Sequence, residues 1–296
     1  SASQTFCNSA TVADLTATGT SIQWYAASSG GSALAGTTSL VNATSYFASQ
    51  TISGCESATR FEVVVTINAP AVPTGSAAQS FCNSATVADL TATGTAIQWY
   101  AASSGGTALA GTTALADGNS YFASQTVSGC ESATRFEVVV TINALPTPGF
   151  TSSPTPVCLN STGNIYTTQS GMTGYIWSIS GGAITSGGTA TDNSATVSWT
   201  SSGSQSISVN YTDGNGCTAT SATLQSVTVN ALPVLSVDVI PNDTVCVGDS
   251  ITLSGVGASS YVWNNGVADG VAFTASATTT YSVTGTDANG CSDTIS

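Results

Sequence analysis

The sequence predicts an all-β protein, a tandem array of four small β-sandwich domains with one disulfide bond in each. Three observations support this prediction. The chain repeats itself at an offset of roughly 75 residues, and four segments each contain a Cys, a Trp, a Tyr and a Gly-Cys pair in that order. In addition, apolar and polar residues alternate along short segments that end in Gly- or Asn-containing turns, which is typical of strands with one buried face.

Composition excludes several classes of function. The 296 residues include 2 Lys and Arg, 15 Asp and Glu and no His, which gives a formal net charge of −13. Without His there is no imidazole base or ligand, and two cations cannot form the basic surface that nucleic acid or an anionic membrane requires. Because 41% of the residues are hydrophobic and only 6% are charged, we expect folded domains rather than an acidic disordered chain.

The internal repeat sets the domain boundaries. Residues 1–69 and 76–144 are near-copies, separated by a linker at 70–75, and the diverged segments 145–230 and 231–296 keep the same order of landmarks. The joints contain proline, which favours extended and semi-rigid spacers. We expect the fourth domain to be truncated in its last strand, and the chain to be a piece of a longer protein. No stretch approaches the roughly 20 apolar residues of a membrane span.

Alternation with a period of two locates the expected core. Along residues 60–67 every second side chain is apolar, so Phe61, Val63, Val65 and Ile67 share one buried face. Trp24 follows the same pattern on an earlier strand, where a single buried Trp is typical of a two-layer β-sandwich. We predict that all five tryptophans are core residues: Trp24, Trp99, Trp177, Trp199 and Trp263.

Several motifs resemble a known group of modules. The first two domains, with Trp24-Tyr25 and Gly54-Cys55-Glu56-Ser57, resemble the Ig-like modules of large secreted Bacteroidetes surface proteins. The third domain, with residues 211–217, resembles the PKD-like modules found beside them, and the fourth resembles the same set through residues 280–291. The resemblance covers essentially the whole chain and implies four small Ig-like/PKD-like β-sandwich domains. Such modules form stalks of repetitive adhesins, including gliding-motility adhesins exported by type IX secretion, and spacers in secreted enzymes.

The eight cysteines fall two to a domain, and one bond per domain is the simplest pairing for separate domains. Cys7 precedes a strand expected at Thr11–Leu15, and Cys55 lies in the turn before the last strand, so each bond is expected to clamp one end of its sandwich. Zinc is disfavoured because no Cys-x2-Cys cluster exists. Persistent disulfides imply an oxidising, extracellular location. The expected pairs are Cys7–Cys55, Cys82–Cys130, Cys158–Cys217 and Cys246–Cys291.

Catalysis is not expected. No His or Lys is present to activate a Ser or Thr nucleophile. Paired carboxylates could in principle cleave glycosides, and Asp14, Glu56 and Glu62 are the candidates in the first domain. A complete catalytic site duplicated in two small sandwiches without large loops is improbable, so we predict that the protein is not an enzyme. The copies of these carboxylates in the second domain are Asp89, Glu131 and Glu137.

Arg60 and its copy Arg135 have two interpretations. They could clamp an anionic ligand, or they could form structural ion pairs with Glu62, Asp14 or Glu56 and the corresponding copies; the structural interpretation is favoured. Tyr25 and Tyr100 alternate away from the tryptophan face, so they could be exposed and stack on sugar rings, or they could pack on the outer face of the sheet or against a loop. Packing is the favoured alternative.

No cofactor is predicted, although calcium stays an alternative. Residues 213–216 and 287–290 resemble the start of a calcium loop, but the later ligands and the closing Glu are missing. An Asn-Gly hairpin turn explains these segments more simply. A calcium ion at a domain joint could use Asp192, Asp238 or Asp243.

Possible modification sites are weak signals. Thr244, Ser250 and Thr294 fit the Asp-Ser/Thr-apolar sequon of Bacteroidetes O-glycosylation. Asn42 and Asn160 fit the N-linked pattern, which matters only in a host with that pathway.

The leading functional prediction is a structural stalk segment of a repetitive extracellular adhesin, which spaces a distal binding region from the cell surface. Its partners would be neighbouring repeats and surface glycans or surface proteins, with no nucleic acid and no membrane insertion. One alternative is a carbohydrate-binding or spacer module of a secreted polysaccharide-degrading protein, which would need an aromatic platform. Another is a subunit of a self-assembling surface filament.

Overall fold

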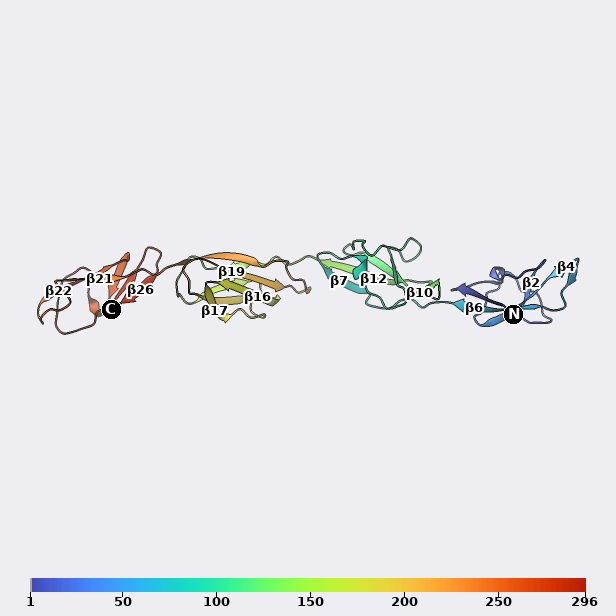
Figure 1. The fold of residues 1–296 in the computed structure, drawn as a ribbon, viewed down its shortest axis with the longest axis horizontal. Coiled ribbons are helices and arrows are strands. Elements are labelled where there is room, and N and C mark those ends of the chain that lie inside the picture. Colours follow the sequence, from blue (N-terminus) through green and yellow to red (C-terminus); the bar gives the residue numbers. More distant parts are fainter. Residues whose placement is uncertain (1) are drawn as a thin grey trace. The chain divides into compact units, whose positions relative to one another are not determined.

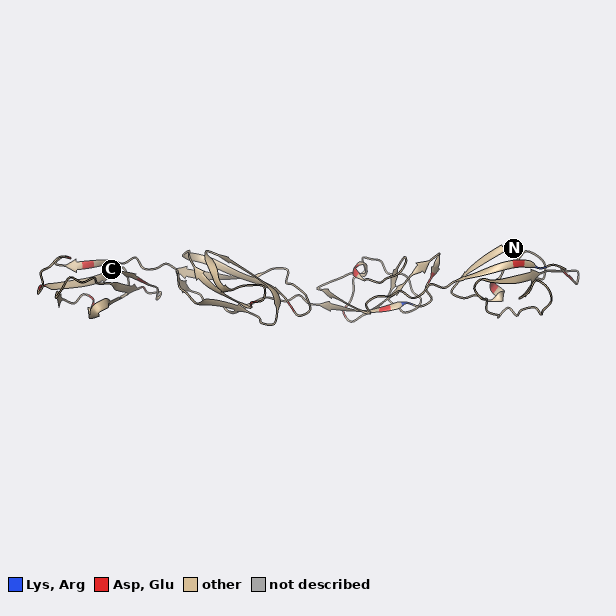
Figure 2. Cartoon of the chain, turned by 90° about the horizontal axis from the view of Figure 1, so that it is seen from below, with Lys and Arg blue, Asp and Glu red and all other residues tan. Residues whose placement is uncertain are grey.

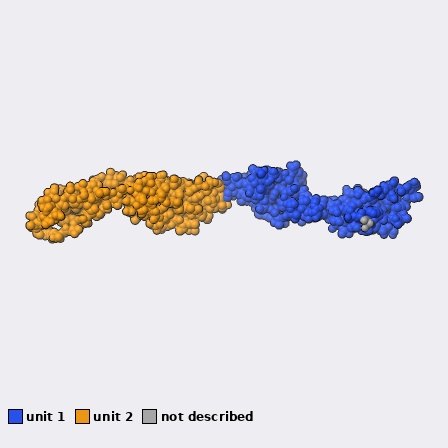
Figure 3. Space-filling view, in the orientation of Figure 1, with its two compact units in different colours: residues 1–144 blue, residues 145–296 orange. Residues whose placement is uncertain are grey.

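The computed structural model describes residues 2–296, and its regular structure is almost entirely strand (Figure 1). The chain divides into two compact units, residues 1–144 and 145–296 (Figure 3). Each unit contains two sets of strands that share no sheet. We call these sets module 1 (β1–β6), module 2 (β7–β12), module 3 (β13–β20) and module 4 (β21–β26).

Module 1 is built on one four-stranded sheet in the order β1-β6-β3-β2. Strand β1 runs parallel to β6, whereas β3 is antiparallel to both of its neighbours. A short hairpin, β4–β5, follows β3 in the chain. The strands are β1 (Ala2–Cys7), β2 (Gln23–Tyr25), β3 (Thr44–Ser49), β4 (Thr51–Ile52), β5 (Cys55–Glu56) and β6 (Phe61–Asn68).

The second layer of module 1 is not a regular sheet. The strand expected at Thr11–Leu15 is a single bridge from Thr11 to Ser39, followed by the 3-10 helix η1 (Val12–Asp14). The backbone turns here for a local reason. Asp14 Oδ2 accepts a hydrogen bond of 2.7 Å from the backbone N–H of Thr11 and one of 2.9 Å from the Thr11 hydroxyl, and together they close the turn. Val12 and Leu15 then pack on the sheet, where Val63 and Val65 are buried as predicted.

Module 2 repeats this plan with the order β7-β12-β9-β8, a β10–β11 hairpin and a 3-10 helix η2 (Val87–Asp89). Its core holds Trp99, Val138 and Val140. The strands are β7 (Ala78–Cys82), β8 (Gln98–Tyr100), β9 (Ser120–Ser124), β10 (Thr126–Val127), β11 (Cys130–Glu131) and β12 (Phe136–Asn143).

Module 3 is a full sandwich of two four-stranded sheets, β13-β15-β18-β17 and β14-β20-β19-β16. Alternation along β18 and β19 turns Val197, Trp199 and Ile207 into the space between the sheets. The strands are β13 (Phe150–Ser152), β14 (Val157–Cys158), β15 (Asn164–Thr168), β16 (Thr173–Ser180), β17 (Gly182–Gly187), β18 (Ser194–Trp199), β19 (Gly203–Thr212) and β20 (Thr223–Asn230).

Module 4 pairs two three-stranded sheets, β21-β22-β24 and β23-β25-β26, around Leu253, Trp263 and Val283. A 3-10 helix η3 (Asn264–Gly266) follows β23. The strands are β21 (Ser236–Ile240), β22 (Ser250–Val256), β23 (Ser260–Trp263), β24 (Phe273–Thr274), β25 (Val283–Thr286) and β26 (Ser292–Ile295). The all-β tandem architecture predicted from the sequence is therefore confirmed.

Candidate functional site

Disulfide bonds join neighbouring modules rather than closing each module on itself. Cys7, the last residue of β1, is bonded to Cys130 at the start of β11, with an S–S distance of 2.04 Å and a Cα–Cα distance of 5.2 Å. The prediction of one bond inside each domain is therefore wrong. The reason is geometric: Cys7 meets the β10–β11 hairpin of module 2, whereas the β4–β5 hairpin that carries Cys55 lies at the far end of module 1 (Figure 1).

Two asparagines hold the same junction without covalent bonds. The Nδ2 of Asn8 donates to the backbone carbonyl of Glu131 at 3.0 Å, and the Nδ2 of Asn68 donates to that of Val127 at 2.7 Å. Cys7 and Asn68 are partners in the parallel β1–β6 ladder, so they end at the same edge of module 1. The bond and its two flanking hydrogen bonds thus form one compact contact surface, and sequence reasoning missed it because the three residues contact another module.

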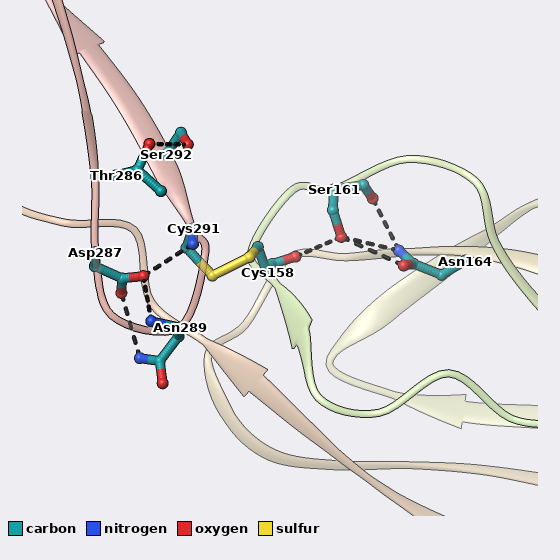
Figure 4. Close-up of a disulfide and its surroundings, with 8 residues drawn as sticks. All are labelled: Cys158, Ser161, Asn164, Thr286, Asp287, Asn289, Cys291 and Ser292. Carbon is teal, nitrogen blue, oxygen red and sulfur yellow. Dashed lines mark hydrogen bonds between the residues drawn. A yellow bond between two sulfur atoms is a disulfide. The ribbon is translucent and has the colours of Figure 1, made fainter. Parts of the chain in front are cut away.

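A second junction joins modules 3 and 4 through Cys158 and Cys291, with an S–S distance of 2.00 Å and a Cα–Cα distance of 5.5 Å (Figure 4). Cys158 ends β14, and its carbonyl accepts the hydroxyl of Ser161 at 2.7 Å. Cys291 lies in the turn between β25 and β26 and is fully buried. Again the first cysteine of one module meets the hairpin cysteine of the next.

Asp287 shapes the turn that presents Cys291. Its Oδ1 accepts the backbone N–H groups of Cys291 and Asn289, both at 2.9 Å (Figure 4). The hydrogen bond from Cys291, followed by smaller contributions from Asn289 and Gly290, holds the pKa of Asp287 below its usual value. The ionised carboxylate therefore stabilises the turn.

Replacing Asp287 by Asn should flatten the acid sensitivity of the β25–β26 hairpin. Because the folded-state pKa of Asp287 is lowered, its stabilisation is complete above the ordinary pKa and is lost as pH falls through the lower folded value. Hydrogen exchange of Ser292–Ile295, measured from about pH 5 down to about pH 2, should show a larger loss of protection in the parent protein than in D287N. An equal loss in both proteins would contradict the assigned role.

The remaining cysteines separate into bonded and free. Cys82 and Cys217 are also disulfide-bonded. Over residues 2–296 the free cysteines are Cys55 and Cys246, and both are exposed. Their expected partners, Cys7 and Cys291, are taken by other modules. The predicted disulfides of Cys55 and Cys246 are therefore wrong for this structure.

Arg60 and Arg135 serve as structural cations. The guanidinium carbon of Arg60 lies 3.3 Å from the centre of the Tyr25 ring, and Nη1 donates to the carbonyls of Ala27 at 2.8 Å and Gly30 at 2.7 Å. Arg135 repeats all three contacts in module 2 and lies 3.9 Å from Glu131. Tyr25 and Tyr100 are accordingly buried, so they do not offer an exposed platform for sugar rings.

The candidate carboxylates of module 1 are engaged locally. Asp14 holds Thr11, Glu56 accepts the Tyr25 hydroxyl at 2.8 Å, and Glu62 accepts the Ser45 hydroxyl at 2.7 Å. Hydrogen bonds from the backbone and the hydroxyl of Thr11 hold the pKa of Asp14 below its usual value. These contacts are those of turns and strand pairs rather than of an acid–base pair.

The aspartates considered as calcium ligands lie apart from one another in the fold. Asp213 Oδ1 accepts the backbone N–H groups of Asn215 and Cys217, as Asp287 does in module 4. Asp192 accepts the backbone N–H and hydroxyl of Thr189, and Asp238 lies on β21. From residue 2 onward, the structure gathers no three His, Cys, Asp or Glu side chains in a way that could hold a metal ion. Figure 2 shows the acidic residues dispersed along the modules.

The tryptophans and an apolar groove in module 4 bear on carbohydrate binding. Four tryptophans are buried, and the half-buried Trp177 donates its indole N–H to the carbonyl of Asp192 at 3.0 Å. A mostly apolar groove of about 620 Å³ opens between the sheets of module 4, with Trp263 and Tyr281 in its wall. Asp243 also lines this groove. The lining of the groove includes residues of the module's own core, among them Leu253 and Trp263.

The three predicted O-glycosylation residues, Thr244, Ser250 and Thr294, are exposed in module 4. Thr294 shares a hydrogen bond of 2.8 Å with Thr284 across β25 and β26. Modification at these residues stays a prediction.

The strands and junctions together define a disulfide-linked array of immunoglobulin-like modules. Residues 1–69 and 70–144 each match the family described as Ig-like domain, CHU_C associated, and residues 144–228 match the PKD-like domain family. Modules 1 and 2 thus belong to the first family and module 3 to the second. The resemblance to Ig-like and PKD-like modules typical of Bacteroidetes surface proteins is confirmed.

Several solved structures of tandem domains have some similarity to the chain. The chain is 13% identical to an ICAM-5 D1–D4 fragment, with 85% of this chain and 81% of that chain covered and a TM-score of 0.35. It is 10% identical to Sidekick-1 immunoglobulin domains 1–5, covering 92% and 72%, with a TM-score of 0.26. For the human Desmocollin-1 ectodomain the identity is 13%, the coverage 85% and 66%, and the TM-score 0.27. No curated protein matches the chain.

The families and the fold define an extracellular structural or adhesion module. Ig-like repeats of this kind commonly contact neighbouring domains or surface proteins, and their β-sandwiches are typically non-catalytic. Disulfide bonds fit an extracellular or surface location. Within residues 2–296, no helix has the length and apolar character needed to cross a bilayer.

Proposed function

We propose that the chain is a structural stalk segment of a repetitive extracellular adhesin, which spaces a distal binding region from the surface of a Bacteroidetes cell after type IX export. The single observation that supports this proposal most directly is the disulfide that passes from each of modules 1 and 3 into the module that follows it. The division into domains 1–69, 76–144, 145–230 and 231–296 is part of the proposal.

A bond between modules changes which residues bear tension. When the two ends of the chain are pulled apart, the shortest covalent path leaves the backbone at Cys7 and rejoins it at Cys130, a sequence separation of 123 residues. It leaves again at Cys158 and rejoins at Cys291, a separation of 133 residues. The intervening strands lie outside the path, so force cannot extend them while the bonds are intact. A stalk built this way keeps its length under load.

Pulling the full chain by its termini in an optical trap tests this proposal. In oxidising buffer we expect no extension step as long as an unfolded module. In reductant, the path gains roughly 420 Å of contour length from the first bond and 450 Å from the second, because an extended residue spans about 3.4 Å. The C55S/C246S double variant, which keeps every bonded cysteine, is the matched control and should behave like the parent protein.

Release of the same length in oxidised and reduced protein would show that the junctions do not shield the modules, and the load-bearing stalk would have to be abandoned.

A carbohydrate-binding role receives no support from the positions of the tryptophans or of Tyr25 and Tyr100.

A further inference from the structure

The exposed hairpin around Cys55 has the same structure as the hairpin that holds module 1 onto module 2. Residues 51–57 and 126–132 differ only in Ile52 against Val127. Both hairpins pair their strands in the same register, Ile52 with Cys55 and Val127 with Cys130. The two turns also share left-handed residues, with φ of 52° and 86° at Ser53 and Gly54 and φ of 49° and 80° at Ser128 and Gly129. The two surfaces are therefore equivalent in sequence and conformation.

What distinguishes the two hairpins is that only one of them is covered. Cys130 is 2% exposed, and Val127 is half-buried beneath the end of module 1. In module 1, Cys55 is exposed and Ile52 is 55% exposed. In module 2 the same residue types bind a cysteine and two asparagine side chains, so the repeat supplies its own internal comparison of an occupied and an unoccupied surface.

We propose that the hairpin around Cys55 is a docking surface for a further Ig-like repeat placed ahead of it in the same polypeptide. The first-strand cysteine of that repeat bonds to Cys55, and its two terminal asparagines donate to the backbone carbonyls of Glu56 and Ile52. Bond formation removes two protons and two electrons from the two thiols, and a disulfide oxidant accepts them and is reduced to two thiols. This inference goes beyond the stalk role, because it holds whether or not the array bears tension.

A repeat in the same polypeptide fits this surface better than a second copy of the chain. The two described junctions run in one direction, from the first cysteine of a module to the hairpin of the following module. A linker as short as residues 70–75 gives the second contact a high effective concentration. The competing thiol, Cys246 of a second copy, is followed by Val247 and lacks the donor that Asn8 supplies beside Cys7.

The test adds one copy of residues 1–75 in front of the full chain, with C55S in the added copy. After equilibration in a glutathione redox buffer, we expect one free thiol per chain, from Cys246. Peptide mapping should recover the added Cys7 bonded to Cys55. The matched control carries C7S as well in the added copy and should show two free thiols. Substituting the added copy's Asn8 and Asn68 by Ala should slow formation of the new bond several-fold.

Three free thiols per chain would overturn the proposal, because the added Cys7 and Cys55 would both be unbonded. Disulfide-linked oligomers through Cys246 of a second copy would overturn it in favour of head-to-tail assembly. An unchanged rate in the asparagine variant would show that the hairpin is a reactive thiol and not a docking surface. The thermal transition of the C7S control verifies that the added repeat is folded. The pulling experiment depends on the Cys7–Cys130 and Cys158–Cys291 bonds, whereas this test depends on a new bond to Cys55. The stalk proposal and the docking proposal can therefore fail separately.

Discussion

Replacing Cys130 by Ser in a C55S background should lower the free energy of unfolding of module 1 by about 4 kcal/mol, while C55S alone should change it by less than about 0.5 kcal/mol. With module 2 folded, the bond from Cys7 to Cys130 closes a loop through unfolded module 1 of roughly 70 residues, which restricts the unfolded chain. Cys55 is exposed and unbonded, so its removal alters neither state of the module.

The substitution and the readout lie in different modules, which makes the result specific. Cys130 is buried in module 2, so C130S also disturbs its immediate surroundings there. Hydrogen exchange followed by mass spectrometry separates the protection of β1, β3 and β6 from that of module 2. Reduction of the parent protein should reproduce the loss of protection in module 1.

The result also discriminates between the two disulfide pairings. If Cys7 were bonded to Cys55 within module 1, C55S alone would destabilise module 1 by the full amount, and adding C130S would have no further effect on it. That outcome would restore the pairing expected from the sequence and remove the junction.

Local patterns in the sequence were sufficient to predict the architecture. Alternation along residues 60–67 placed four side chains on one buried face, and Val63 and Val65 are fully buried there. Phe61, at the start of β6, is 50% exposed, so the prediction is wrong for that residue. The order of Cys, Trp, Tyr and Gly-Cys predicted four segments, and most of these landmarks lie on or beside a strand. Alternation also predicted burial of Trp24, Trp99, Trp199 and Trp263, and only Trp177 is half-buried.

The errors came from contacts that no local pattern encodes. Cys7 and Cys55 lie at opposite ends of module 1, and Cys7 is bonded to Cys130 of module 2 while Cys55 is free. Counting two cysteines per module therefore paired the wrong thiols. Tyr25 alternates with Trp24 and was open to either exposure or packing, but Arg60, far along the chain, covers its ring. The prediction of a strand at Thr11–Leu15 was wrong for a local reason. Asp14 accepts a hydrogen bond from the backbone N–H of Thr11, and the backbone turns into the 3-10 helix η1 instead.

Trp199→Ala should destabilise module 3 by about 3–5 kcal/mol, enough to leave so small a module marginally folded. Trp199 is fully buried, its ring centre lies 6.0 Å from that of Tyr166 in an edge-to-face arrangement, and its Nε1 donates to the Tyr166 hydroxyl at 3.2 Å. That hydroxyl in turn donates to the carbonyl of Pro154 at 2.8 Å. Removing the indole leaves a cavity beside Tyr166 and takes away a donor from a buried hydroxyl.

Two further variants separate these contributions. W199F keeps an aromatic ring and loses the donor, so it should cost about 1–2 kcal/mol. W177A removes a half-buried ring at the edge of the same core and should cost less than W199A. Urea denaturation followed by hydrogen exchange of β15, β18 and β19 measures all three variants on one scale.

Protection in modules 1 and 2 should stay unchanged in W199A, because their cores are separate from that of module 3. If W199A costs no more than W177A, the space between the sheets of module 3 is not the tightly packed core described above. If modules 1 and 2 lose protection together with module 3, the modules do not fold independently. The array would then unfold as one cooperative body, and its resistance to load would depend on its weakest core rather than on the disulfides between modules.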